Sequence, residues 1–103
     1  MPEKLKTRPF DPAEYLGTDE AIMAYIEEAI ETSDPAFIAD ALGVVARARG
    51  MSQVAKDAGL GRESLYKALS VDGNPEFGTI LRVLKALGVK LSVAPAAAPD
   101  VAS

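Results

Sequence analysis

The side chains best suited to recognise another molecule lie within one short polar segment. Arg62 can donate two parallel hydrogen bonds to guanine, and Ser64 can bond a base either way. Lys67 can meet a phosphate or a base, and Glu63 can accept from cytosine or repel a non-cognate backbone. Tyr66 lies between them. These residue types suit base edges and phosphates, so we expect all five to bind DNA.

A second set of residues is placed to anchor a phosphate backbone. Ser52 and Gln53 begin a short predicted helix, whose free amide hydrogens and positive dipole end favour an anion. Lys56 adds charge there, and Asn74 offers the same geometry before the last predicted helix. For Ser52 and Asn74, simple helix capping is an equally good interpretation.

The composition excludes most catalytic chemistry. Cysteine and histidine are both absent, so thiolate nucleophiles, disulfides, the common zinc sites and imidazole acid–base catalysis are ruled out. No base is positioned to activate Ser or Thr. Glu27 and Glu28 are neighbours that point apart on a helix, which favours a solvated face over a catalytic pair. The sequence therefore predicts a protein that is not an enzyme, with no cofactor and no metal.

Charge is divided unevenly along the chain. The net charge of the whole chain is −4. Residues 1–43 carry a net −7, whereas residues 44–92 carry a net +4. Such asymmetry indicates two different surfaces, one of them able to approach a polyanion, although both can also be ordinary solvated faces.

Helical spacing of apolar residues predicts an all-α fold of five helices. They are bounded by caps, prolines and glycines: from Thr18 or Asp19 past Ile30, from Ser33-Asp34-Pro35 to Gly50, about 52–58, about 62–69, and from Asn74-Pro75 to Gly88. The three longer helices carry apolar stripes, namely Ile22, Tyr25, Ile26, Ala29 and Ile30; Phe37, Ile38, Ala41, Leu42 and Val45; and Phe77, Ile80, Leu81, Leu84 and Leu87.

The ends of the chain are predicted to differ from its middle. Residues 1–18 are predicted to form an N-terminal arm, 19–93 the domain, and 94–103 a disordered tail. Alternation at 89–93 predicts a short C-terminal strand, paired with a second copy of the chain; a coil after the helix is an equally good interpretation. No apolar run approaches the roughly 20 residues of a membrane helix and no signal peptide is visible, which favours a cytoplasmic protein without a membrane partner.

The run from Met51 to Ser70 resembles the helix-turn-helix of phage-repressor-type regulators. Ala55 is small where two helices cross, and Gly59 stands where the turn favours a left-handed backbone. Packing residues are predicted at Val54, Leu60, Leu65 and Ala68. Gly61, which we also expect to contact DNA, occupies the capping position of the second helix, where Ser or Thr is usual, at a cost of a few tenths of a kcal/mol. An ordinary helical hairpin is the alternative.

A wider resemblance covers most of the chain from Phe10 to Val93. The order of features is similar to that of the addiction-module antidote (antitoxin) family, most specifically in the run Arg-Glu-Ser-Leu-Tyr-Lys-Ala-Leu-Ser at 62–70 and in Gly-Asn-Pro at 73–75. This resemblance implies about five helices, a homodimer that binds its own double-stranded operator DNA, and a compact ribonuclease-type toxin as partner.

Two functions are consistent with these features. The first is an antitoxin that represses its own transcription, with the basic second half on operator DNA and the acidic first half on a cationic toxin. The alternative is a stand-alone prophage-type repressor without a toxin partner. Their DNA chemistry is the same, and the neighbouring open reading frame distinguishes them.

Overall fold

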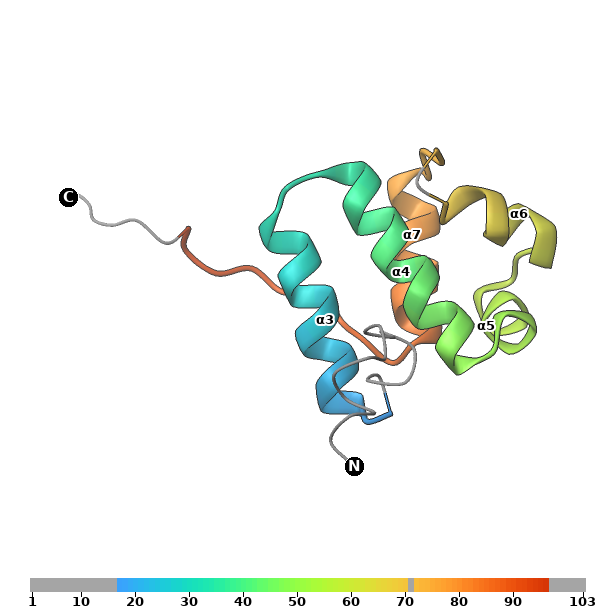
Figure 1. Cartoon of the computed structure of the whole chain (residues 1–103), viewed down its shortest axis with the longest axis horizontal. Coiled ribbons are helices and arrows are strands. Elements are labelled where there is room, and N and C mark those ends of the chain that lie inside the picture. Colours follow the sequence, from blue (N-terminus) through green and yellow to red (C-terminus); the bar gives the residue numbers. More distant parts are fainter. Residues whose placement is uncertain (1–16, 71, 97–103) are drawn as a thin grey trace, which may run out of the picture.

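Five helices follow one another in a computed structural model that describes residues 17–70 and 72–96. In chain order they are α3 (Asp19–Glu31), α4 (Pro35–Arg49), α5 (Met51–Ala58), α6 (Arg62–Ala68) and α7 (Phe77–Ala86). Figure 1 shows α4 in the middle, with α3 on one side and α5 and α6 on the other. The predicted all-α class is confirmed; its detailed likeness to phage repressors and the domain boundaries stay predictions. Residues 1–16, most of the predicted arm, and 97–103 of the predicted tail lie outside the described residues.

The first two helices form a hairpin whose ends are set by side-chain caps. Thr18 Oγ1 accepts a hydrogen bond from the amide of Ala21 at 3.1 Å and so begins α3. Asp34 Oδ1 accepts from the amide of Ala36 at 3.1 Å, and Pro35 takes the first position of α4. Each cap satisfies amides that have no partner inside the helix. Thr18, rather than Asp19, is therefore the cap of α3.

One ion pair links the start of α3 to the end of α4. Arg49 Nη2 lies 2.7 Å from Asp19 Oδ1, and the two side chains are 39% and 84% exposed. A pair this exposed contributes about 0–1 kcal/mol. The apolar contacts between α3 and α4 therefore stabilise the hairpin more than this ion pair does.

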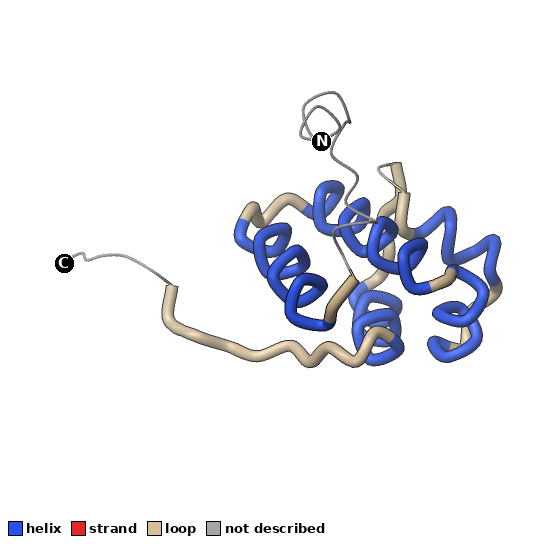
Figure 2. Tube along the Cα trace, turned by 60° about the horizontal axis from the view of Figure 1, so that its bottom comes forward, coloured by secondary structure: helices blue, strands red, loops and turns tan. Residues whose placement is uncertain are grey.

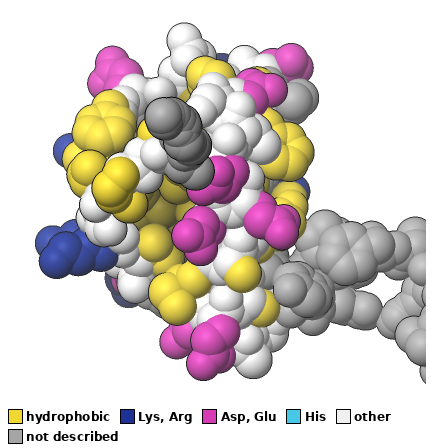
Figure 3. All heavy atoms as spheres, turned by 90° about the vertical axis from the view of Figure 1, so that its left-hand side faces the viewer, with side chains coloured by type: hydrophobic (Ala, Val, Ile, Leu, Met, Phe, Trp, Pro, Cys, Tyr) yellow, Lys and Arg dark blue, Asp and Glu magenta, His cyan; other side chains and the backbone are white. Residues whose placement is uncertain are grey.

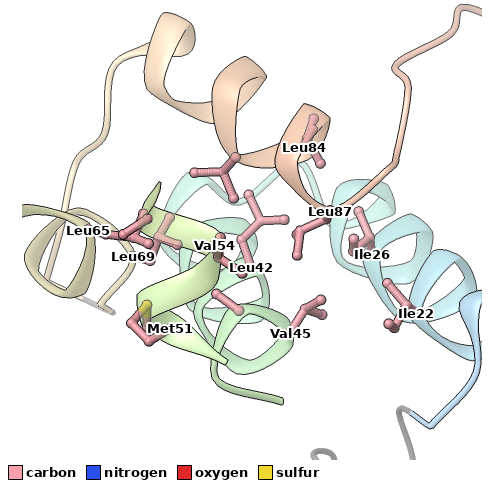
Figure 4. Packing of buried hydrophobic residues seen from close by; sticks show 13 residues of the cluster. Ile22, Ile26, Leu42, Val45, Met51, Val54, Leu65, Leu69, Leu84 and Leu87 are labelled. Carbon is pink, nitrogen blue, oxygen red and sulfur yellow. The ribbon is translucent and has the colours of Figure 1, made fainter. Parts of the chain in front are cut away.

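The core is aliphatic and draws on every helix (Figure 4). Its members include Ile22, Ile26, Leu42, Val45, Val54, Leu65, Leu69, Val83, Leu84 and Leu87. No polar or charged side chain is buried within the described residues. The structure is therefore stabilised by close packing of branched apolar groups, which is sensitive to changes in side-chain volume.

Several residues predicted to be buried lie at the surface instead. Phe37 is 48% exposed and Phe77 is 67% exposed, while Leu81 and Ile30 are 42% and 39% exposed. The apolar stripes are wider than the faces that the neighbouring helices cover. In α7, Val83 is fully buried, although the predicted stripe did not include it. The exposed residues leave an apolar surface that the core does not use.

The predicted strand at 89–93 is wrong. Residues 89–96 have no strand assignment, and Figure 2 shows this segment as a loop that leaves the helices. Within the described residues no second strand is present to pair with it. The Val89 amide instead donates to the carbonyl of Leu84 at 2.8 Å, just after Gly88 adopts a φ of 78°. The segment therefore begins as the C-terminal cap of α7.

Tyr25 should make the stability of the fold depend on pH in the alkaline range. Burial raises the pKa of this phenol and Asp40 raises it further, while Arg47 lowers it. The folded protein keeps the phenol proton to a higher pH than the unfolded chain, whose tyrosine pKa is about 10. The free energy of unfolding should therefore fall as the pH rises above about 10. In Tyr25→Phe, the free energy of unfolding should fall less steeply between pH 9 and pH 11, as measured by urea titrations at several pH values. The same pH dependence in the variant and the wild type would contradict a raised pKa for Tyr25.

Candidate nucleic-acid interface

The turn between α5 and α6 is built by its backbone. Gly59 adopts a left-handed φ of 72°, as predicted, which an L side chain rarely adopts. The Gly59 amide donates to the Lys56 carbonyl at 3.1 Å, and the Leu60 amide donates to the Ala55 carbonyl at 2.9 Å. These bonds close α5 and turn the chain into α6 within three residues. Ala55, the predicted crossing residue, is buried.

Apolar residues hold α6 against the rest of the protein. Val54 and Leu65 are buried as predicted, while Leu60 and Ala68 are half-buried. Leu69, just after the helix, is also buried, although the predicted packing set did not include it. Leu65 and Leu69 lie on the core side of this segment in Figure 4. Anchors on this side leave the opposite face of α6 exposed.

The exposed face of α6 carries the five residues expected to bind DNA. Arg62, Glu63, Ser64, Tyr66 and Lys67 are all exposed. The Arg62 guanidinium lies over the Tyr66 ring, 5.6 Å from its centroid. A cation–π contact between exposed groups, within about 6 Å, contributes about 0.5–1 kcal/mol. The contact therefore favours an Arg62 orientation beside Tyr66, and the guanidinium stays exposed.

The N-terminal end of α5 offers free backbone donors. Gly50, with a φ of 111°, precedes Met51, and no side chain caps this end. Ser52 is exposed but is not the cap, so the interpretation of Ser52 as a helix cap is wrong. Uncapped amides at a helix N-terminus can bind a phosphate oxygen. Lys56, one turn further along, is exposed as well.

Gln53 already has a hydrogen-bond partner in the free protein. Its Nε2 donates to Asp57 Oδ1 at 2.9 Å, one turn along α5. The amide is exposed, so this bond competes with water and can be exchanged for a bond to a ligand. Asp57 also places a negative charge beside Lys56, which lowers the positive potential of α5.

Asn74 is placed differently from the prediction. The helix α7 begins at Phe77, after Glu76, so Asn74 does not cap it and Pro75 is not its first residue. The extended backbone of Glu76, with a ψ of 155°, delays the helix beyond the proline. Asn74 is exposed and lines an apolar groove together with residues of α3 and α4. Its role in DNA binding stays a prediction, and its capping role is wrong.

Two glycines position the C-terminal end of α6. A Cβ on Gly43 of α4 would lie 2.4 Å from the carbonyl oxygen of Leu69, and one on Gly73 would lie 2.3 Å from that of Ala68. Neither distance is possible without moving backbone. The predicted site omitted both residues. The signal for Gly43 was a glycine inside an otherwise regular helical stripe, where alanine is normally more stable.

Gly61 lies at the N-cap of α6, as predicted, and it provides no side chain to cap the helix. It precedes Arg62 with an extended backbone, at φ −72° and ψ 146°, and no side chain caps α6. The first amides of α6 are consequently open to solvent. Together, α5 and α6 present Lys56, Arg62 and Lys67 against Asp57 and Glu63. The surface is weakly basic, so it suits contacts at particular positions more than attraction by bulk charge.

The described residues also lack two features. No cluster of His, Cys, Asp and Glu in residues 17–70 and 72–96 could hold a metal ion. No helix in those same ranges has the length and hydropathy needed to cross a membrane.

Comparison with known proteins places the chain in a family. Residues 6–95 match the model of the family described as "Probable addiction module antidote protein". The chain is also 50% identical over 93 residues to an uncharacterized protein of Haemophilus influenzae, covering 90% of this chain and 94% of that protein. No solved structure matches it. The match extends across all five helices.

Proposed function

This chain belongs to the family of probable addiction module antidote proteins, and we propose that it is an antitoxin that binds its own operator DNA. It represses transcription as a homodimer and neutralises a small ribonuclease-type toxin encoded beside it. The family match supports the antidote role. The exposed polar face of α6 supports the role in DNA binding, and it is the observation that carries this part of the proposal.

In this proposal α6 enters the major groove and α5 anchors the phosphate backbone. In helix-turn-helix proteins the second helix contacts base edges through exposed polar side chains. The helix α6 exposes five such side chains and is held to the core by buried apolar residues. The open amides of α5 bind a phosphate, and Arg62 reads guanine. In a two-fold dimer the half-sites lie about 10 base pairs apart, or a multiple of that.

We expect Arg62→Ala to weaken operator binding by about 1–3 kcal/mol and to relax preference at one base pair. Lys67→Ala should weaken binding to all sequences more evenly and reduce its salt dependence. The measurement is a gel shift with the DNA upstream of the gene, at two salt concentrations. The matched control is Arg82→Ala, which removes an exposed positive charge from α7, and it should bind like the wild type. Unchanged binding in both α6 variants would remove α6 from the proposed interface.

The antitoxin part has a separate test. Expression of the neighbouring reading frame should stop growth, and co-expression of this chain should restore it. The two proteins should also co-purify as one complex. If the neighbouring product is harmless and forms no complex, the antitoxin proposal fails, while the DNA-binding proposal can still be judged by the gel shift.

A further inference from the structure

An apolar groove is lined by residues outside α5 and α6. It is formed by α3, the start of α4, the start of α7 and the segment after α7, and its volume is about 340 Å³. Its walls include Ile30, Ile38, Phe77, Ile80 and Leu91. No charged side chain lines it. Figure 3 shows hydrophobic side chains around a hollow on this face.

Several of the apolar side chains that line the groove are exposed. Phe77 is 67% exposed, and Ile30 and Leu91 are each 39% exposed. These side chains come from three separate segments and converge on one hollow. Contiguous exposed apolar surface with a polar rim marks an interaction site more often than scattered apolar residues do.

The rim of the groove is acidic along α3 and beside Phe77, whereas Lys90 directly precedes the groove-lining Leu91. Between residues 18 and 46 the chain has seven acidic residues and no lysine or arginine. Glu27 and Glu31 directly follow the groove-lining Ile26 and Ile30 on α3, and Glu76 directly precedes Phe77. All three are exposed. Figure 3 shows acidic side chains in a column beside the hydrophobic hollow. A partner seated in the groove therefore meets negative charge at its edges.

We propose that this groove is where the toxin docks: it takes an apolar side chain from a toxin segment that also carries lysine or arginine. The inference rests on the proposed antitoxin function and adds its binding surface. The apolar groove provides burial, and the acidic rim speeds association and selects a basic partner. A second copy of this chain fits less well, because a two-fold contact centred here would bring two acidic rims together.

The test measures affinity between the full-length chain and the purified product of the neighbouring reading frame by isothermal titration calorimetry. Ile30→Lys and Phe77→Lys should each weaken binding at least tenfold, with operator binding and the circular dichroism spectrum unchanged. The double variant Glu27→Lys/Glu31→Lys alters only exposed residues, so it keeps the fold, and it should weaken binding and flatten its salt dependence. The matched control is Met23→Lys, an exposed apolar position of α3 outside the groove, which should bind within twofold of the wild type.

A second probe separates the groove from the proposed function. A synthetic helical peptide of lysine and leucine should shift the NMR signals of groove residues, and a glutamate–leucine peptide of equal length should not. If the wild type binds the neighbouring product and the groove variants bind it equally well, the groove proposal is overturned and the antitoxin function stands. If the basic peptide binds in the groove and the neighbouring product does not, the chemistry of the groove stands and its assignment to the toxin is overturned. If groove variants convert a dimer into a monomer and leave toxin binding unchanged, the groove is the interface between copies and the proposal is overturned.

Discussion

Replacing Leu65 with alanine should lower the free energy of unfolding by about 2–5 kcal/mol. Leu65 is the buried residue of α6 and has no exposed surface. It belongs to the same cluster as Val54, Leu69 and Val83, so the truncated side chain leaves a cavity that several helices surround. α6 has only seven residues and cannot be helical on its own. The loss should therefore reach the face of α6 that is proposed to bind DNA as well as the core.

Urea denaturation followed by circular dichroism measures this effect, and Leu81→Ala is the matched control. Leu81 is also a leucine in a helix, but it is 42% exposed, so its truncation should cost far less than that of Leu65. Equal losses in the two variants would show that Leu65 is not the anchor of α6. Amide hydrogen exchange should in addition show faster exchange of the α6 amides in Leu65→Ala than in Leu81→Ala.

Gly43→Val should be nearly as harmful, with a loss near the upper end of the about 1–3 kcal/mol that overpacking costs. The added Cβ would meet the Leu69 carbonyl oxygen at 2.4 Å, and this atom belongs to the backbone that ends α6. Relief requires α4 and the segment after α6 to move apart. We therefore expect reduced operator binding at temperatures where the variant is still folded.

Gly78→Val is the matched control for that substitution. Gly78 lies in the first turn of α7, and a Cβ built there meets nothing within 4 Å. The same chemical change should leave thermal stability nearly unchanged. If Gly43→Val and Gly78→Val have the same melting temperature, the close approach of α4 to Leu69 is not a constraint on the fold.

The number and type of helices could be read from the sequence because caps and breakers act locally. Thr18, Asp34 and Gly59 each do what their residue type predicts, since a cap or a left-handed turn depends on a few neighbouring atoms. The exposed face of α6 followed for the same reason: once Leu65 is inside, helical geometry turns Glu63, Ser64 and Lys67 outward.

Predictions from the sequence failed where the local structure depends on contacts with distant segments of the chain. Asn74-Pro75 has the composition of a helix start, yet the helix begins at Phe77. Phe77 and Phe37 continue apolar stripes but lie beyond the area that neighbouring helices cover. The alternation at 89–93 suits a strand, and no strand in the described residues pairs with it. In the same way, the need for glycine at position 43 depends on a carbonyl 26 residues away, which local patterns cannot reveal.

The contact between Arg62 and Tyr66 places a fluorescent side chain beside a residue that is expected to bind DNA. The sequence has no tryptophan and three tyrosines, so tyrosine is the source of its ultraviolet emission. Of the two tyrosines in the described residues, Tyr25 is half-buried on α3, while Tyr66 lies on the face expected to meet DNA. In the double variant Tyr15→Phe/Tyr25→Phe, Tyr66 is the one tyrosine left in the sequence, so quenching upon addition of a ligand would report on α6 from inside the chain, without an attached dye.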